Sequence, residues 1–256
     1  RNTILGGLAG DALTTGADNV AIGYQAMTTD DAGGRNVAVG KGALESQNGG
    51  DANVFNIGIG YHAGNSMTSG TLNTIIGGNA GDALTTGSSN IAIGYNALST
   101  EDTGQANIAI GQGALQTANF DGTGYNVAVG HEAGTAMTTG TNNVIVGGLA
   151  GDSLTTSGAN VAVGYQALSF EDTTGGVTAI GYQALKTQNT SSTSYNVAVG
   201  YQAGKEVTTG TENTIIGGLA GDALTTGEDN TALGYNALTN AQEDGRNTAI
   251  GRGALA

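Results

Sequence analysis

Carboxylates are the side chains in this sequence whose type and spacing most resemble a chemical site. Neighbouring acids occur in four loops that share one phase of an internal repeat. These pairs are Asp30/Asp31, Glu101/Asp102, Glu171/Asp172 and Glu243/Asp244. A glycoside hydrolase also uses two carboxylates, one as acid and one as base or nucleophile. A catalytic pair is built once, however, so four copies at one phase predict a charged edge of solvated loops.

Four single aspartates recur at another phase of the repeat and are candidates for calcium binding. They are Asp11, Asp82, Asp152 and Asp222. Calcium-binding β-rolls are rich in Gly and Asp, but their nine-residue GGxGxD spacing is absent here. Equivalent aspartates would lie four coils, or about 19 Å, apart, so one chain cannot bring two of them to one ion. We therefore expect turn-capping or solvated aspartates, with a calcium-dependent secreted β-roll as a lesser alternative.

The other candidates for chemistry give weaker signals. His62 and His131 lack the spacing of metal ligands, and we expect them at the surface. The glycine-rich segment 6–11 lacks the strand–helix context of a phosphate-binding loop, which favours a turn. No cysteine is present to supply a thiolate or a disulfide. The sequence thus predicts no catalytic residue, no metal or cofactor site, and no enzymatic activity.

Charge and hydropathy argue against two classes of partner. Only 7 Lys and Arg residues stand against 21 Asp and Glu residues, which gives a formal net charge of −14. Such a chain repels phosphate backbones, so we expect no nucleic-acid partner. Because no apolar run approaches the roughly 18 residues of a membrane span, we expect no membrane insertion.

The elements that position all these residues are coils of a repeat. The motif Asn-x-x-[Ile/Val/Leu]-Gly begins fourteen units, and Val177 replaces the asparagine in one more. The spacing is 17 residues, except 20 after Asn36 and 19 after Asn107 and Val177. The long steps recur every fourth unit, so the superrepeats are 2–72, 73–142, 143–212 and the partial 213–256. We expect one repeat array over residues 1–256, as a segment of a longer fibre.

Each unit begins with a short strand that is rich in β-branched residues and ends at an invariant glycine, a strand-and-turn signal. An invariant alanine follows three residues after the glycine. One larger apolar residue then follows. It comes directly after the alanine, as at Leu98, or glycine takes that place and the apolar residue comes three positions later, as at Leu84. Short strands and turns in a 17-residue unit predict an all-β fold, a parallel β-solenoid of fifteen coils with a thin interior.

Both faces of the strands are apolar, so both need cover. In the strand at residues 126–130, Val127 and Val129 share one face and Ala128 lies on the other. We expect the Ala/Ile face to be turned toward sister chains in a homotrimer, although a homodimer would cover it equally well. The candidate interface residues are Ile4, Ala21, Ala38, Ile75, Ala92, Ala109, Ala128, Ile145, Ala162, Ala179, Ala198, Ile215, Ala232 and Ala249.

The repeat resembles two groups of surface fibres. The segments NVAIG at Asn19 and NIAIG at Asn90 resemble head repeats of trimeric autotransporter adhesins, which are left-handed parallel β-rolls that form trimers. The runs NTALGYNALT at 230–239 and NVAVGYQAL at 160–168 resemble repeats of bacteriophage and related viral tail fibres even more. This chain departs from the adhesin heads in its 17-residue coil and its four-coil superperiod. The resemblance implies a left-handed homotrimer, an extracellular place on a virion tail fibre or bacterial cell surface, and a role in host attachment.

Aromatic residues are the candidates for contact with a host glycan or receptor. Seven of the nine tyrosines directly follow the invariant glycine and should form an interrupted row. They are Tyr24, Tyr61, Tyr95, Tyr165, Tyr182, Tyr201 and Tyr235. The simpler interpretation is stacking that closes each coil, and the alternative is a sugar-binding stripe. The insertions of the third units, at 45–55, 116–125 and 186–195, should protrude as recognition or spacer loops. Their aromatic residues are Phe55, Phe120, Tyr125 and Tyr195.

The sequence therefore favours the structural and adhesive shaft of a trimeric fibre, of the phage tail-fibre type, with a cell-surface adhesin as the alternative. An ice-binding solenoid is a lesser alternative. Its support is the threonine pairs Thr14/Thr15, Thr85/Thr86, Thr155/Thr156 and Thr225/Thr226. Adjacent threonines on a strand point to opposite faces, so these pairs do not form a flat Thr-x-Thr plane.

Overall fold

The chain folds into coils that each contribute one short parallel strand. The computed structural model describes residues 1–50, 53–173, 175–191, 193–243 and 245–256, and in these ranges it contains strands and turns but no helix. The chain divides into two compact units, Arg1–Asn126 and Val127–Ala256. The prediction of a parallel β-solenoid is confirmed.

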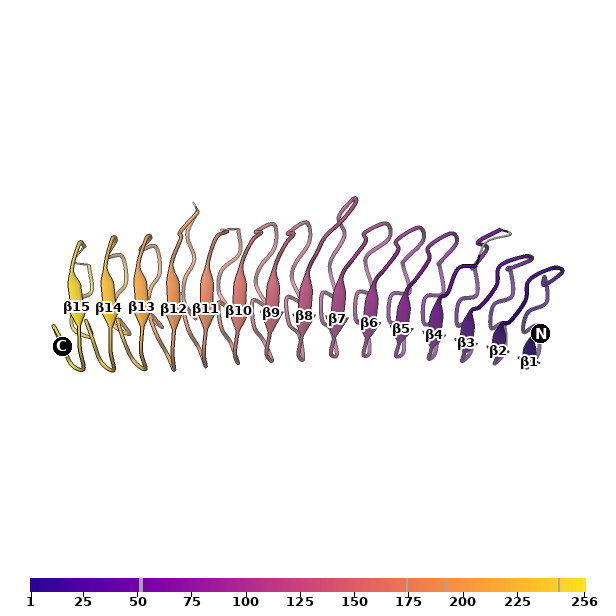
Figure 1. Ribbon diagram of the computed structural model, residues 1–256, viewed down its shortest axis with the longest axis horizontal. Helices are drawn as coiled ribbons and strands as arrows, with labels where there is room; N and C mark the ends of the chain where they lie inside the picture. The colour runs from indigo at the N-terminus through magenta and orange to yellow at the C-terminus, as the bar shows by residue number, and fades with distance from the viewer. Residues whose placement is uncertain (51–52, 174, 192, 244) are drawn as a thin grey trace. The chain divides into compact units, whose positions relative to one another are not determined.

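Within each unit, consecutive strands pair in parallel and in register, so that Ala21 lies beside Ala38 and Ala162 beside Ala179. Figure 1 shows the strands of each unit side by side, with one turn of chain between neighbours. The first unit contains β1 (Thr3–Leu5), β2 (Val20–Ile22), β3 (Val37–Val39), β4 (Ile57–Ile59), β5 (Thr74–Ile76), β6 (Ile91–Ile93) and β7 (Ile108–Ile110). The second contains β8 (Val127–Val129), β9 (Val144–Val146), β10 (Val161–Val163), β11 (Thr178–Ile180), β12 (Val197–Val199), β13 (Thr214–Ile216), β14 (Thr231–Leu233) and β15 (Thr248–Ile250).

The central residue of each strand points into the coil, and this corrects the expected oligomer interface. Thirteen of the fourteen candidate residues are buried inside the single chain, and only Ile4, in the first strand, is exposed. The buried ones are Ala21, Ala38, Ile75, Ala92, Ala109, Ala128, Ile145, Ala162, Ala179, Ala198, Ile215, Ala232 and Ala249. The interior is too thin for a large residue in most coils. At Gly58 the apolar side chain of Leu44 occupies the space, so that even an added Cβ would lie 2.7 Å from Leu44 Cγ.

We call the larger apolar residue that fills each coil the plug. One backbone position explains why the plug occurs at two different places in the repeat. The residue after the invariant alanine is left-handed in every coil that the structure describes, with φ of 53° at Leu98 and 48° at Gly81. A leucine there reaches the interior directly, although left-handed backbone is unfavourable for it. Where glycine takes the position, the plug comes three residues later, and Leu84 is fully buried. From the second coil to the fourteenth, a buried plug is supplied by one of these two routes, as predicted. Leu13 in the first coil is only partly buried, and Leu255 in the last is exposed.

The strand-ending glycine is required because successive coils approach closely at that corner. Gly94 has φ of 134°, and an added Cβ would lie 2.5 Å from the carbonyl oxygen of Gly111 in the next coil. Left-handed backbone and backbone contact both exclude a side chain here.

The repeated asparagine forms a ladder inside the solenoid, a role that the sequence pattern did not disclose. The side-chain oxygen of Asn19 accepts a hydrogen bond from the backbone N–H of Asn36 at 2.9 Å. Its Nδ2 donates to the carbonyl of Gly33 at 2.8 Å. Val177 still donates its N–H to Asn160 at 3.0 Å, but its own side chain has no amide to continue the ladder.

Candidate functional site

The most extensive functional candidate is the outward face of the strands. Its side chains are the first and third residues of each strand, and all of them are Val, Ile, Leu or Thr. Several are substantially exposed, such as Ile180 at 37% and Leu233 at 44%. In each unit, the strands thus present an uncharged and largely apolar face to solvent, while their central Ala and Ile side chains fill the coils. We call this surface the outer sheet face.

In each unit, the tyrosines that follow the invariant glycine occupy equivalent positions of their coils, directly after the strand, and we call this row of positions the tyrosine column. Tyr165, Tyr182 and Tyr201, from successive coils, form a stack with ring centroids 5.6 and 5.2 Å apart. The rings remain about half exposed, between 42% and 55%. The structural interpretation of this row, stacking at the coil corner, is therefore confirmed for these three residues. Exposure leaves them available for a ligand as well.

The other tyrosines of this column make different contacts. Tyr61 stacks on His62 at 3.9 Å, and the ammonium of Lys41 lies 5.5 Å from the Tyr61 ring. The guanidinium of Arg252 lies 5.5 Å from the Tyr235 ring. Tyr24 and Tyr95 are also about half exposed.

A ladder of amides accompanies the tyrosine stack. Gln183 Nε2 donates to Gln166 Oε1 at 2.8 Å, and Gln202 Nε2 donates to Gln183 Oε1 at 2.9 Å. These glutamines directly follow the stacked tyrosines in the sequence. The column therefore combines aromatic rings with polar groups that can exchange hydrogen bonds with hydroxyls.

The insertion loops provide three exposed aromatic residues and one buried one. Phe55, Tyr125 and Tyr195 are 45–63% exposed. Each takes a left-handed φ of 51–53°, at the turn before the next strand. Phe120 is only 5% exposed, so its nomination as a receptor contact is wrong. Its ring fills the inside of its own loop, where it packs close to Gly124. Residues 51–52 and 192 of these insertions lie outside the described residues.

The paired acids correct the expectation of solvated loops. The first acid of three pairs, at Asp30, Glu101 and Glu171, is fully buried. Asp30 Oδ1 accepts the N–H of Gly33 at 2.8 Å, and Glu101 Oε1 accepts the N–H of Gly104 at 2.6 Å. The carboxylates of Asp30 and Glu101 therefore fold back and close their loops, while Glu171 accepts hydrogen bonds from Asp172, Gln188 and Thr190. Asp244, of the fourth pair, lies outside the described residues.

Burial has an electrostatic consequence for two of these acids. Desolvation raises the pKa of Asp30 and of Glu101, and hydrogen bonds from backbone N–H groups oppose the rise. Each carboxylate also accepts a hydrogen bond from the next coil, Asp30 from Asn36 Nδ2 at 3.3 Å and Glu101 from the N–H of Phe120 at 3.2 Å. The two acids lie in coils that are not neighbours, so they do not form an acid–base pair.

Of the four single aspartates, Asp82, Asp152 and Asp222 are partly buried at turns and Asp11 is exposed. Burial raises the pKa of Asp82, Asp152 and Asp222. In the described ranges, no group of three or more His, Asp or Glu side chains is arranged to hold a metal ion. His131 lies 3.9 Å from the Glu132 carboxylate in an exposed contact.

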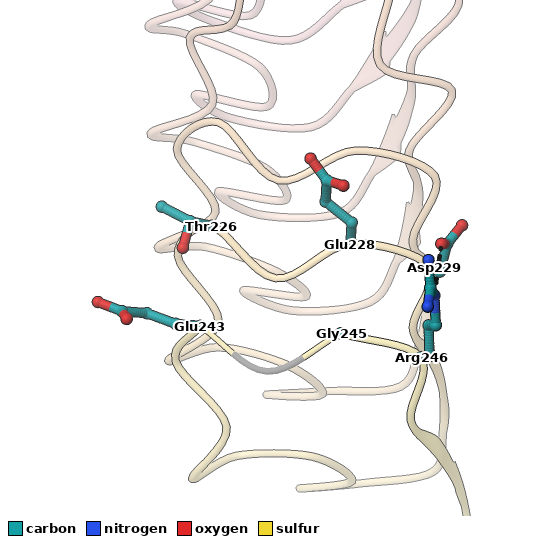
Figure 2. A pocket seen from close by; sticks show the side chains of 6 residues that line it. All are labelled: Thr226, Glu228, Asp229, Glu243, Gly245 and Arg246. Atoms are coloured by element: carbon teal, nitrogen blue, oxygen red, sulfur yellow. Dashed lines mark ion pairs between the residues drawn. The ribbon is translucent and has the colours of Figure 1, made fainter.

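A shallow acidic depression lies on the second unit, between two neighbouring coils (Figure 2). It is lined by Thr226, Glu228, Asp229, Glu243, Gly245 and Arg246. Arg246 Nε lies 3.6 Å from Asp229 Oδ2 in an exposed ion pair. The side chains of Glu228 and Glu243 point away from one another in Figure 2, so the depression lacks convergent catalytic groups.

Comparisons with known protein families, characterised proteins and solved structures found no match to this chain. No helix long and apolar enough to cross a membrane occurs in the described part of the chain.

Proposed function

We propose that the chain is the shaft of a homotrimeric surface fibre that takes part in host attachment. The observation that carries the proposal is the uncharged outer sheet face. Its side chains carry no charge and several of its Val, Ile and Leu residues are exposed, and exposed apolar patches of this kind mark surfaces that bind a partner.

A second copy of the same chain is the partner that this face fits best. Its side chains repeat with the spacing of neighbouring strands, about 4.8 Å. A parallel copy repeats with the same period and therefore meets the face in register over many coils. The seven strands of the first unit carry fourteen outward side chains and the eight strands of the second carry sixteen. A stable interface engages about 20 to 30 residues on each partner, a number that the outer sheet faces of the two units reach when a partner covers both. The face is thus large enough for stable association.

The resemblance to tail-fibre and adhesin repeats supports a trimer, an extracellular place and a role in host attachment. In this proposal the interface residues are Val, Ile, Leu and Thr of the outer sheet face, in place of the Ala/Ile residues first expected. The tail-fibre type is favoured by segments such as 230–239, and a cell-surface adhesin is the alternative.

Disulfide trapping tests this proposal directly, because the chain has no cysteine. In a parallel, in-register assembly, equivalent residues of the outer sheet face meet near the symmetry axis. A Val161→Cys variant should therefore form covalent dimers under mild oxidation, seen on a non-reducing gel. Thr226→Cys is the matched control, since Thr226 is exposed and lies away from this face. Equal cross-linking of both variants, or none of either, would contradict the proposal.

A further inference from the structure

The tyrosine column is interrupted by glycine in the first coil of every superrepeat. These glycines are Gly7, Gly78, Gly148 and Gly218. The backbone does not require them, because none has a left-handed φ. A Cβ added at Gly218 would lie 3.5 Å from Tyr235 Cδ2, an ordinary van der Waals contact. The missing side chain is therefore not explained by the folding of the coil.

The glycine leaves a space of one ring between two tyrosines. Tyr201 precedes Gly218 by one coil and Tyr235 follows it by one coil. The stacked rings of Tyr165, Tyr182 and Tyr201 are 5.2 to 5.6 Å apart from one coil to the next. We therefore expect rings two coils apart to be separated by about 10 Å, or two strand spacings. A flat ring inserted between them would have each tyrosine at the distance that stacked rings prefer, about 4.5 to 7 Å.

An equivalent gap exists in the first unit. Gly78 lies between the coils of Tyr61 and Tyr95, and a Cβ added there would be 3.5 Å from Tyr95 Cδ2. Tyr61 and Tyr95, in the two coils beside this gap, are 51% and 56% exposed. At Gly148 a tyrosine is present on one side only, because the preceding coil has His131 in this column.

Polar groups beside the Gly218 gap favour a sugar over a purely aromatic ligand. The amide ladder stops at this coil, because Leu219 takes the position of the glutamines. Gln202 already donates its Nε2 to Gln183, so its Oε1 is the acceptor at the open end of the ladder. A pyranose ring has apolar C–H faces for the tyrosines and edge hydroxyls for this oxygen. The net charge of −14 disfavours acidic sugars.

We propose that the gaps at Gly218 and Gly78 each bind one neutral pyranose ring of a glycan, which occupies the place of the missing tyrosine. The proposal rests on the attachment function, which supplies the glycan, but the binding itself does not depend on the outer sheet face. Assembly of several chains would bring several of these weak sites onto one particle. Their combined binding to a surface would then be much tighter than that of a single site.

The test uses the full chain and immobilised neutral oligosaccharides: maltohexaose, cellohexaose, mannohexaose and chitohexaose. Wild-type chain should bind at least one of them. The double variant Gly78→Leu/Gly218→Leu fills both gaps and should weaken that binding at least tenfold. Tyr235→Ala should weaken it as well. Gln112→Leu is the matched control, because its position in the column is already occupied by a side chain, and it should bind like wild type.

Light scattering on the same samples separates this inference from the assembly proposal. The double leucine variant should keep the wild-type mass while it loses glycan binding. The inference is overturned if wild-type chain binds none of the four sugars at millimolar concentration, or if the leucine variant binds as wild type does. Loss of binding together with a fall in mass would also overturn it, because the column would then belong to the interface between chains.

Discussion

The side-chain oxygen of Asn73 accepts a hydrogen bond from the backbone N–H of Asn90, one coil later, at 2.9 Å. The Nδ2 of Asn73 donates at the same time to the carbonyl of Gly87, also at 2.9 Å. Both asparagines are fully buried. One polar side chain therefore links two coils inside an interior that has few large apolar residues. This arrangement recurs along each unit and fixes the register between strands.

Removal of one asparagine side chain from this ladder should lower the stability of the fold measurably. Asn90→Ala deletes the acceptor for Asn107 N–H and the donor to Gly104 carbonyl. Because these backbone groups are then left unpaired inside the protein, we expect a loss of about 1 to 3 kcal/mol in the free energy of unfolding. Urea unfolding followed by circular dichroism measures it. Asn240→Ala, at an exposed loop position, should change stability by less than about 0.5 kcal/mol.

The close approach of coils at the strand-ending glycine predicts a second effect. Gly94→Ala adds a Cβ at left-handed φ and against the Gly111 carbonyl oxygen. We expect a loss of more than about 1 kcal/mol in the free energy of unfolding. Gly218→Ala is the matched control, since its φ and surroundings admit a Cβ. If both variants unfold at the same urea concentration, the corner contact does not matter for stability.

The two faces of a strand should respond differently to charge. Ala162→Asp places a carboxylate inside the coil, where Ala162 is fully buried, and should unfold the surrounding coils because an unpaired buried charge is costly. Val161→Asp places the same group on the outer sheet face and should leave the β-sheet circular dichroism intact while it lowers the assembled mass. Equal behaviour of the two variants in both measurements would contradict the assignment of inner and outer faces.

The buried carboxyl of Glu101 predicts a pH dependence of stability. Burial raises the pKa of Glu101 in the folded chain above its value in the unfolded chain. The folded state therefore holds its proton more tightly, so this group contributes stability below the unfolded pKa, and the contribution is lost as pH rises through the folded pKa. Glu101→Gln cannot titrate, and its unfolding free energy should fall less than that of wild type over this interval. If Glu101→Gln follows the wild-type pH profile, burial of this carboxyl does not contribute to the pH dependence.

The sequence was sufficient to predict the coils, the strands and the plugs because each depends on local spacing. Seventeen-residue recurrence of β-branched residues before glycine predicts strands that stack in parallel. The invariant alanine and a following apolar residue, such as Leu98 or Leu84, predict a thin interior. The structure has both features.

The orientation of the strands could not be predicted from alternation, because both faces are apolar. Ala128 and its equivalents lie inside the coil, and so do the larger Ile75, Ile145 and Ile215, whose coils carry glycine after the invariant alanine. The space inside each coil therefore decides which face is covered, and alternation alone does not reveal it. Burial of Asp30 and Glu101 was also missed, since an acid in a loop gives no sequence signal that its carboxylate closes that loop. Phe120 was misassigned for the same reason, because an insertion loop can fold around its own aromatic side chain.

The mass of the wild-type chain in solution is the most direct test of the central claim, that copies of the solenoid cover one another's outer sheet face. Sedimentation equilibrium at micromolar concentration measures this mass without a label. The proposal predicts a single species of three times the 25.1 kDa chain mass, with a circular dichroism spectrum dominated by β-sheet. A stable species of one chain mass, with the same spectrum and at every concentration, would contradict it.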